Sequence, residues 1–312
     1  MKHISVVPYD VNWPHQYERE SVKIKESLGD NLLEIHHIGS TSVPSLSAKP
    51  IIDIIGVVSS FTLAIPILEE IGYEPRGEMH LPFRLYLRKG KDINLHLYEK
   101  SSPEIDLNLS FREYLRTHPE SCREYQELKK TLLTKQSSFQ KKDSNYTGYN
   151  LGKDEFIRSI LQKSGFDKIR IMYANHYHEL EIAKKFRQKY FFDKVPVNDP
   201  YTWTFNHPGH LHLLLYKGVE IVGYSHVQLW PENRSAMRII VIDEIKRNSG
   251  MGGNFLELIE KLLKTKEYKI LHTESSPEAV SFYRKHGYIE MLFNDPEGEK
   301  TDPRDTAMGK ML

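Results

Sequence analysis

The spacing of apolar residues along the chain changes repeatedly between the period of a strand and that of a helix. In the first half, the pattern predicts three strands and one long helical region, at 50–58, 83–88, 92–99 and 111–142. In the second half, it predicts a helix at 177–190 and a hairpin that turns at Lys217–Gly218. The elements expected after the hairpin are a strand, a helix, a strand, a helix and two strands, at 237–243, 251–265, 269–275, 277–287, 288–294 and 306–312.

A break in this pattern near residue 166 divides the chain into two predicted domains. The segment "KDEFIRSILQKSGF" is typical of a closing helix, with Asp154 as its cap and Gly165 as its stop. The segment "DKIRIMYAN" then opens a new strand. We therefore expect domains at 1–166 and 167–312, both of the α/β (α+β) class, and 312 residues are enough for a sizeable core in each.

Composition narrows the class of protein without giving a function. The net charge of +1 predicts no nucleic-acid partner and no attraction to an anionic membrane. Cys122 is the single cysteine, which excludes an intramolecular disulfide and fits a reducing cytoplasm. The segment "MKHISVVPYDVNWP" has no signal-peptide pattern. The apolar run 51–68 is interrupted by Asp53 and Pro66, so a strand, a turn and a short helix are expected there instead of a membrane span.

The helical region 111–142 carries several lysines that have two interpretations. They are Lys129, Lys130, Lys135, Lys141 and Lys142. A nucleic-acid-binding face is one interpretation, and a solvated helix surface is the other. Because Glu124 and Glu127 are interleaved with them, we favour the solvated surface.

The glycine-rich segment "KRNSGMGGNF" lies between a predicted strand and an amphipathic helix. Backbone N–H groups in such a loop, together with the positive end of the helix, form a cradle for an anionic group. Glycines permit close approach and unusual φ angles. A P-loop is excluded because Gly-Lys-Ser/Thr is absent, and a dinucleotide fingerprint is excluded because its third glycine is replaced by Phe255.

The spacing Arg247-x-x-Gly250-x-Gly252 resembles the acetyl-CoA pyrophosphate loop of the GNAT acetyltransferases. Downstream, "PEAVSFYRKHGY" resembles a later helix of that family, in which the matching positions are Ala279, Tyr283, Gly287 and Tyr288. The resemblance covers roughly residues 168–312 and implies a GNAT acyl-CoA acyltransferase fold. It also implies that acetyl-CoA is the acetyl donor and that a small-molecule primary amine is the acceptor.

The same resemblance assigns roles to individual residues. A backbone N–H near Ile242 would hold the oxyanion of the thioester, and Tyr283 would protonate the leaving thiolate. The loop residues that would contact the pyrophosphate are Arg247, Asn248, Ser249, Gly250, Met251, Gly252 and Gly253. The structural alternative for Tyr283 is a core aromatic residue on an amphipathic helix.

Two departures from the family pattern leave the general base unassigned. Ser276 stands where an asparagine is common, and the strand "SAMRIIVID" lacks the glutamate that often acts as base. His226 and Glu232 are substitutes, although each is more often an ordinary strand-end residue. His207, His210 and His212 could suggest a zinc site, but no fourth ligand is evident, so no metal site is expected.

The first half contains an acid in an unusual place. Asp53 interrupts the apolar strand "PIIDIIGVV", where a carboxylate needs a partner or an opening to solvent. The run "HHIGSTSVPSLSAKPIIDII", together with "LSFREYLRTHPESCREYQELK" and "YNLGKDEFI", resembles the GrpB family over roughly residues 1–165. Ser45 is a departure, since the family commonly has glycine there. The resemblance implies a nucleotidyltransferase-like mixed sheet with helices.

That superfamily places Gly-Ser before a strand with two acids that bind metal ions. Here Asp53 matches the first acid, Ile55 occupies the second position, and His96 is the best candidate for the third, so the two-metal site is incomplete. We expect a pocket that binds a nucleotide-like or other phosphorylated ligand, or that helps to select the acceptor. Its predicted residues are Gly39, Ser40, Thr41, Ser42, Lys49, Asp53 and His96. The structural alternative has Asp53 bonded to the N–H groups of the loop 39–42.

The leading hypothesis is therefore a cytoplasmic N-acetyltransferase with an N-terminal ligand-binding domain. One rival makes the N-terminal half a metal-dependent nucleotidyltransferase. The other rival is an acetyl-CoA-binding sensor or scaffold without turnover. Aminoglycosides, polyamines, amino acids and protein N-termini are all compatible acceptors, because acceptor pockets are built from variable loops.

Overall fold

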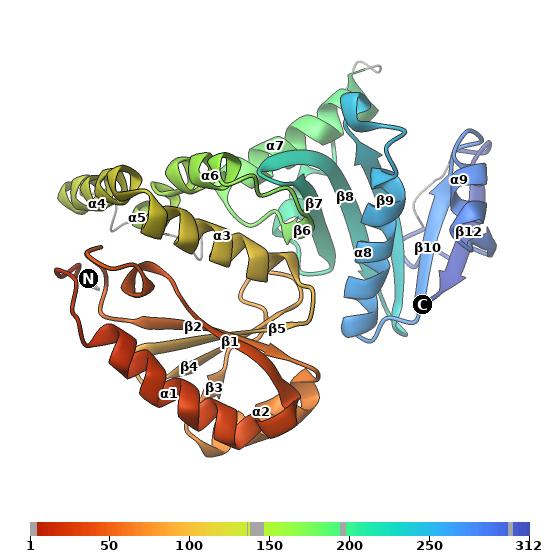
Figure 1. The fold of residues 1–312 in the computed structure, drawn as a ribbon. Helices are drawn as coiled ribbons and strands as arrows, with labels where there is room; N and C mark the ends of the chain where they lie inside the picture. Colours follow the sequence, from red (N-terminus) through yellow and green to blue (C-terminus); the bar gives the residue numbers. More distant parts are fainter. Residues whose placement is uncertain (1–4, 136, 138–146, 194–197, 299–301) are drawn as a thin grey trace. The chain divides into compact units, whose positions relative to one another are not determined.

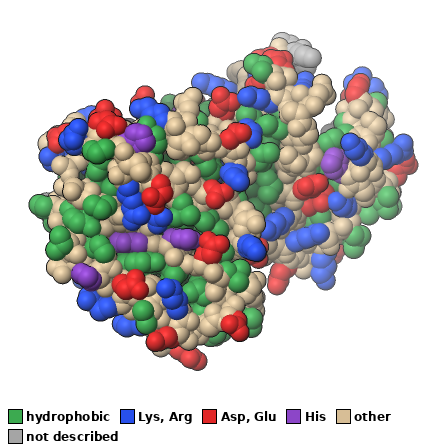
Figure 2. Space-filling model, in the orientation of Figure 1, with side chains coloured by type: hydrophobic (Ala, Val, Ile, Leu, Met, Phe, Trp, Pro, Cys, Tyr) green, Lys and Arg blue, Asp and Glu red, His purple; other side chains and the backbone are tan. Residues whose placement is uncertain are grey.

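The computed structural model describes residues 5–135, 137, 147–193, 198–298 and 302–312 (Figure 1). The chain forms two compact units, Met1–Ile169 and Arg170–Leu312. The expected domain limits at residues 166 and 167 stay a prediction. On the face drawn in Figure 2, acidic and basic side chains are interspersed. Among the described residues, no helix is both long enough and apolar enough to cross a membrane.

The first unit is built on a five-stranded mixed sheet in the order β1-β2-β5-β4-β3. Strands β2 and β5 are parallel, and the other neighbouring pairs are antiparallel. Helices α1 and α2 lie on one side of the sheet, and α3 to α6 lie on the other (Figure 1). The bounds are α1 Trp13–Leu28, β1 Leu32–Ile38, β2 Ile52–Val58, α2 Phe61–Glu70, β3 Glu74–Pro75, β4 Arg84–Lys89, β5 Ile93–Glu99, α3 Pro103–Thr117, α4 Pro119–Thr134, α5 Gly148–Leu151 and α6 Asp154–Lys163.

The two faces of this sheet differ in polarity, as the alternation of β5 predicts. Leu95 and Leu97 are fully buried in the core under α1 and α2. Asn94 and His96 belong to the opposite face, where β5 pairs Asn94 with Asp53 of β2. Successive side chains of a strand point to opposite faces of the sheet, so one face can be buried in the apolar core while the other carries polar groups. The sheet therefore aligns polar side chains on the face toward α3 to α6.

The first unit differs from the sequence predictions in several details. Helix α1 and strand β3 were not predicted, and the helical region begins at Pro103 and not at Phe111. Strand β1 was not predicted, because its segment "LLEIHHI" lacks a clear alternation. The predicted helical region 111–142 is divided at His118, because the following Pro119 disfavours a helical conformation there; residues 136 and 138–142 of this region lie outside the described part. The cap of α6 is Lys153 and not Asp154, which is the first helical residue.

Ser45 adopts a left-handed backbone conformation with a φ angle of 66°. Glycine suits this conformation, because a side chain there meets the backbone. Ser45→Gly is therefore expected to stabilise the first unit by about 0.5 kcal/mol, after the greater freedom of glycine in the unfolded chain is subtracted. Urea denaturation followed by circular dichroism measures this change. A loss of stability would show that the exposed Ser45 side chain contributes more than its backbone strain removes.

The second unit is built on a seven-stranded sheet in the order β11-β12-β10-β9-β8-β7-β6. Strands β9 and β10 are parallel, whereas β12 and β8 run antiparallel to their neighbours. The bounds are β6 Ile169–Tyr173, α7 Tyr177–Arg187, β7 His210–Lys217, β8 Glu220–Trp230, β9 Arg234–Ile242, α8 Met251–Thr265, β10 Ile270–Ser275, α9 Val280–Lys285, β11 Ile289–Glu290 and β12 Thr306–Met311.

Helices α7 and α8 cover opposite faces of this second sheet. Ile239 and Val241 of β9 belong to the core that packs under Ala183 and Phe186 of α7. Ile242, one position further along, faces the start of α8. The predicted elements are confirmed here, and α8 has the predicted bounds. Helix α9 and strand β11 are shorter than predicted, and the helix predicted at 177–190 continues after Arg187 as a π-helical turn, Gln188–Phe192.

Candidate functional site

The glycine-rich loop before α8 adopts, at Gly250, the unusual φ angle that the glycine pattern predicts. Gly250 is left-handed, with a φ angle of 79°, and stands directly before the first helical residue. The first N–H groups of a helix lack partners within the helix, so they are free to meet an anion beyond the N-terminus. Arg247 closes the loop, because its Nε donates to the carbonyl oxygen of Ile242 at 3.1 Å.

The other two glycines have different surroundings. A Cβ on Gly253 would lie 2.7 Å from Cε1 of His286, which belongs to the segment that follows α9. A Cβ on Gly252 would make an ordinary contact of 3.5 Å with Phe282. The missing side chain of Gly253 therefore permits the packing of this segment against α8, and the contact of Gly253 with a pyrophosphate stays a prediction.

Two neighbouring strands separate beside this loop. The parallel pairing of β9 with β10 ends at Met237 and Thr273, although β9 continues to Ile242. The pairing of β9 with β8 skips Arg238, so a β-bulge lies where the separation begins. The N–H of Asp243 points to β8, where it donates to Val222. Because successive N–H groups of a strand alternate in direction, the N–H of Ile242 points to the side that β10 has left.

Tyr283 lies at the point where the two strands separate. Its side chain is 5% exposed and interacts with the hydroxyl of Thr273, the last residue of β10 that pairs with β9. Burial raises the pKa of Tyr283 to about 12. The phenol therefore holds its proton at neutral pH, which suits a group that gives a proton away.

Neither substitute for the missing glutamate fits the role of a base. His226 is 4% exposed, with one ring nitrogen bonded to Arg187 and the other to His210. Burial lowers the pKa of His226 well below its ordinary value. The Glu232 side chain is 83% exposed in the turn between β8 and β9, at the end of β9 opposite the glycine loop. Within the described residues, no group of three His, Cys, Asp or Glu side chains is arranged to hold a metal ion.

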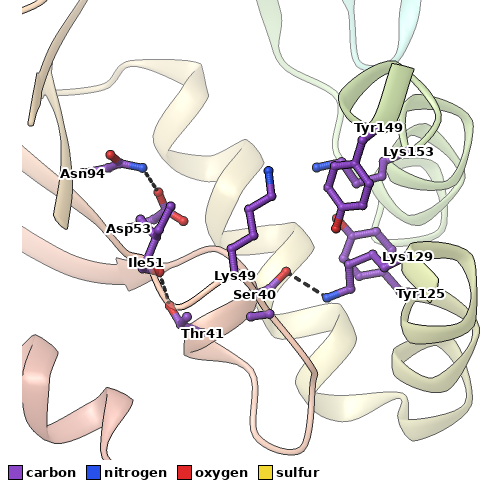
Figure 3. A pocket seen from close by; sticks show the side chains of 11 residues that line it. Ser40, Thr41, Lys49, Ile51, Asp53, Asn94, Tyr125, Lys129, Tyr149 and Lys153 are labelled. Carbon is purple, nitrogen blue, oxygen red and sulfur yellow. Dashed lines mark hydrogen bonds between the residues drawn. The ribbon is translucent and has the colours of Figure 1, made fainter. Parts of the chain in front are cut away.

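The first unit contains a cavity of about 240 Å³ on the polar face of its sheet. Asp53 forms one wall, where one carboxylate oxygen accepts from the Asn94 amide at 2.8 Å and lies 3.7 Å from His96 Nε2. Two tyrosines and three lysines approach from other segments (Figure 3). The lining residues are Ser40, Thr41, Ala48, Lys49, Ile51, Asp53, Asn94, Tyr125, Lys129, Tyr149 and Lys153.

Gly39 belongs to this site for two structural reasons. Its φ angle is 70°, and a Cβ built on it would lie 2.6 Å from the second carboxylate oxygen of Asp53. Any side chain at this position would therefore displace Asp53. Ser42 and Thr41 hold the loop together, because Ser42 Oγ donates to Gly39 O at 2.6 Å and Thr41 Oγ1 donates to Ile51 O at 3.1 Å.

The lysines make the cavity cationic. The ammonium groups of Lys49 and Lys153 lie 4.7 and 4.9 Å from the ring centre of Tyr149, and Lys129 Nζ donates to Ser40 Oγ at 3.2 Å. Burial, together with the charge of a neighbouring lysine, lowers the pKa of Lys129 to about 7 and that of Lys153 to about 8. An anion bound between them would favour their charged forms.

The structure combines predicted pocket residues with others that the sequence analysis missed. Of the predicted set, Ser40, Thr41, Lys49 and Asp53 line the cavity, and His96 and Gly39 contact Asp53. Ser42 supports the loop. The solvated-surface interpretation was wrong for Lys129, which is 3% exposed, whereas Lys130 and Lys135 are exposed; Lys141 and Lys142 lie outside the described residues. Lys153 was missed because the segment that it opens, "KDEFIRSILQKSGF", was interpreted only as a closing helix.

Together, the structure contains a mixed-sheet unit with a cationic cavity and an α/β unit with separated central strands and a helix-capping glycine loop. The sequence profile described as "GrpB protein" matches residues 3–163, and the profile described as "Acetyltransferase (GNAT) domain" matches residues 173–312. The chain belongs to the GrpB family through its N-terminal domain, and its C-terminal domain is a GNAT acetyltransferase domain.

Individual relatives match one domain each. The UPF0157 protein YqkA of Bacillus subtilis is 37% identical over 162 residues, which are 50% of this chain and 46% of that protein, so the chain spans about half the length of this relative. The UPF0157 protein BH1888 of Halalkalibacterium halodurans is 40% identical and matches 41% of this chain and 69% of that protein.

Two solved structures each resemble one domain of the chain. The crystal structure of conserved protein GrpB from Enterococcus faecalis is 38% identical, with a TM-score of 0.46, and covers 51% of this chain and 96% of that chain. An acetyltransferase of the GNAT family from Staphylococcus aureus is 20% identical, with a TM-score of 0.39, and covers 46% of this chain and 99% of that chain.

Proposed function

We propose that this protein is an acetyl-CoA-dependent N-acetyltransferase that acts on a primary amine. The observation that carries the proposal is the left-handed Gly250 at the start of α8, beside the separated ends of β9 and β10. An anionic pyrophosphate suits the helix N-terminus. A chain of amide groups, such as the arm of CoA, suits the β9 backbone that β10 leaves.

The proposed reaction forms a bond between the amine nitrogen and the acetyl carbon and breaks the bond between that carbon and sulfur. The N–H of Ile242 is the proposed donor to the oxygen that becomes negative during the attack. Tyr283 is the proposed acid, and its proton moves to the leaving sulfur, while the proton that the amine nitrogen loses passes to solvent, from which the phenol is protonated again. Arg247, held by the carbonyl of Ile242, keeps the loop residues 248–250 in position for the pyrophosphate.

Tyr283→Phe tests the proposed acid. Because general acid catalysis contributes about 10²–10⁴-fold, we expect kcat to fall by roughly that range while the affinity for acetyl-CoA stays the same. The matched control is Tyr288→Phe, which removes a hydroxyl from a buried tyrosine whose ring lies 5.3 Å from that of Tyr283. Release of CoA with a panel of amines measures kcat. Equal rates for wild type and Tyr283→Phe would eliminate the phenol as the acid.

For the N-terminal domain, we propose that the cavity binds a nucleotide-like or other phosphorylated ligand. The observation in favour is the gathering of Lys49, Lys129 and Lys153 around a cavity that contains a single carboxylate, Asp53. Phosphate oxygens accept hydrogen bonds from ammonium groups strongly, and they neutralise the mutual repulsion of the lysines. The single Cys122 supports a cytoplasmic location for the whole chain.

The residues of this cavity do not fit a two-metal nucleotidyltransferase site. Divalent cations in such sites need several carboxylate ligands. The second acid position is Ile55, which is fully buried, and the side chains closest to Asp53 are an amide and an imidazole. The lysines would also repel a divalent cation. Ligand binding is therefore proposed without nucleotidyl transfer.

A further inference from the structure

The carboxylate of Asp53 is held in place by a short chain of hydrogen bonds along the polar face of the first sheet. The Tyr86 hydroxyl donates to Asn94 Oδ1 at 2.7 Å, and Asn94 Nδ2 donates to Asp53 Oδ1 at 2.8 Å. Because an amide oxygen only accepts, this chain runs from Tyr86 to Asp53 and fixes the orientation of the Asn94 amide. His96 Nε2 lies 3.7 Å from the same carboxylate oxygen. These side chains therefore position one oxygen of Asp53.

The other carboxylate oxygen of Asp53, Oδ2, has no hydrogen-bond partner in the part of the chain that the structure describes. The Asp53 side chain is 29% exposed and lines the cavity. In Figure 3, this second oxygen points toward the side on which Lys49 lies. Since a carboxylate oxygen only accepts hydrogen bonds, Oδ2 suits a donor group of a ligand.

Lys49 and Lys153 line the same cavity as Asp53 but do not pair with it. Neither ammonium group forms an ion pair or a hydrogen bond with another described residue, although each lies against the ring of Tyr149. The charge of Asp53 is nevertheless felt at Lys49, because it opposes the lowering of the Lys49 pKa by burial. The acid and the two ammonium groups are therefore separated by the space of the cavity.

This separation gives the cavity two ends of different chemistry. Figure 3 shows Asp53 on one side of Lys49 and Lys153 on the other side. The lysine end suits an anionic group such as a phosphate. The Asp53 end suits a hydroxyl group better than an ammonium group, because the neighbouring lysines would repel a further cation.

The volume of the cavity, about 240 Å³, limits the size of the group that it encloses. Sites for drug-sized ligands have about 300–1,000 Å³, so this cavity fits a smaller molecule or one part of a larger molecule. A five-carbon sugar phosphate carries a phosphate at one end and hydroxyl groups along the rest of its length. The same unit is present in a nucleotide.

We propose that the cavity binds a sugar phosphate unit, with the phosphate at Lys129 and Lys153 and a sugar hydroxyl at Asp53 Oδ2. The inference rests on the phosphate binding proposed for the N-terminal domain, and it narrows the ligand to phosphates that carry hydroxyl groups. Free sugar phosphates and nucleotides share this chemistry. Asn94 is a positioning residue, since it acts through Asp53.

Three five-carbon phosphate esters test the hydroxyl contact in the full chain: D-ribose 5-phosphate, n-pentyl phosphate and 5-aminopentyl phosphate. In isothermal titration of wild type at pH 6.5, we expect D-ribose 5-phosphate to bind about tenfold or more tightly than n-pentyl phosphate. AMP distinguishes the two sources of the sugar phosphate unit. Tighter binding of AMP than of D-ribose 5-phosphate indicates a nucleotide, and equal or weaker binding indicates a free sugar phosphate.

Asp53→Ala should remove the preference for D-ribose 5-phosphate. Its affinity for n-pentyl phosphate should stay the same or rise, because the carboxylate no longer repels the phosphate, and this retained binding shows that the variant folds. Asp53→Asn, which keeps an acceptor for the Asn94 amide, should lose less of the preference. The control is Asp92→Ala, which removes an exposed acid from the turn between β4 and β5 and should leave every affinity unchanged.

Three results would overturn the hydroxyl contact. They are equal affinities of wild type for D-ribose 5-phosphate and n-pentyl phosphate, a preference that Asp53→Ala retains, and tightest binding of 5-aminopentyl phosphate, which would show that Asp53 receives an ammonium group. In each case, the binding of the esters would leave the phosphate proposal intact. Binding of none of the esters and of no inorganic pyrophosphate would refute the phosphate proposal itself.

Discussion

Gly250→Glu is expected to abolish the thermal stabilisation that acetyl-CoA gives to the C-terminal domain. A ligand present at about 100 times its Kd adds roughly 2.7 kcal/mol to the domain that binds it, so the wild-type shift should be several degrees. The glutamate would place a carboxylate at the start of α8, where the phosphates are proposed to bind. Two negative groups at one helix N-terminus repel each other, and the positive φ of Gly250 also disfavours a side chain.

Gly218→Glu separates the loss of binding from the backbone strain. Gly218 has a φ angle of 57° in the turn between β7 and β8, so the same side chain meets a similar strain away from the proposed loop. Both variants should melt at lower temperatures than wild type without ligand. Only Gly218→Glu should keep the shift with acetyl-CoA. A shift that persists in Gly250→Glu would place the binding of acetyl-CoA elsewhere.

Lys129→Met is expected to weaken the binding of ATP to the N-terminal domain at pH 6.5 by about tenfold to a hundredfold. This range corresponds to a lost hydrogen bond to a charged group, at about 1.5–3 kcal/mol. Lys130→Met is the matched control, because Lys130 follows directly on α4 but is exposed and paired with Glu127. Isothermal titration measures both, with inorganic pyrophosphate as a second probe.

The affinity of the wild-type cavity should also fall as the pH rises from about 6 to about 9. A lysine is charged below its pKa, and the pKa values of Lys129 and Lys153 in the free protein are about 7 and about 8. At higher pH, the ligand must first restore these protons, which weakens binding. Lys129 also donates a hydrogen bond to Ser40, so its loss could disturb the loop as well as the binding of the phosphate. Lys153→Met therefore provides a second variant. An affinity that neither variant changes, or that rises with pH, would show that the lysines do not bind the phosphate.

The second domain could be predicted well because its signals are local. The apolar face of α8 and the glycines before it lie within one short segment, so both bounds of α8 were predicted. By contrast, β1 contains two histidines and a glutamate, and it is a strand because β2 pairs along it from Leu32 to Ile38. The division of the helical region at His118 was visible in the sequence, since Pro119 follows.

The cavity residues were harder to predict because they come from distant segments. Asn94 was recognisable, since strand alternation places it on the face of His96, and pairing places it opposite Asp53. Lys129 looked like a surface residue, because only the folded chain brings it within 3.2 Å of Ser40. In the sequence, His210 suggested a metal ligand, and His226 suggested a general base. Both imidazoles lie on strands and belong to one hydrogen-bond network, because Arg187 of helix α7 donates to His226, which is in turn bonded to His210.

Amine-dependent release of CoA from acetyl-CoA, with the acetylated product identified by mass spectrometry, tests the central claim most directly. With the amine panel and the full chain, we predict release above the rate without amine, a product heavier by one acetyl group, and loss of both in Gly250→Glu. Binding of acetyl-CoA without release for any amine of the panel would contradict the enzyme assignment and would favour an acetyl-CoA sensor.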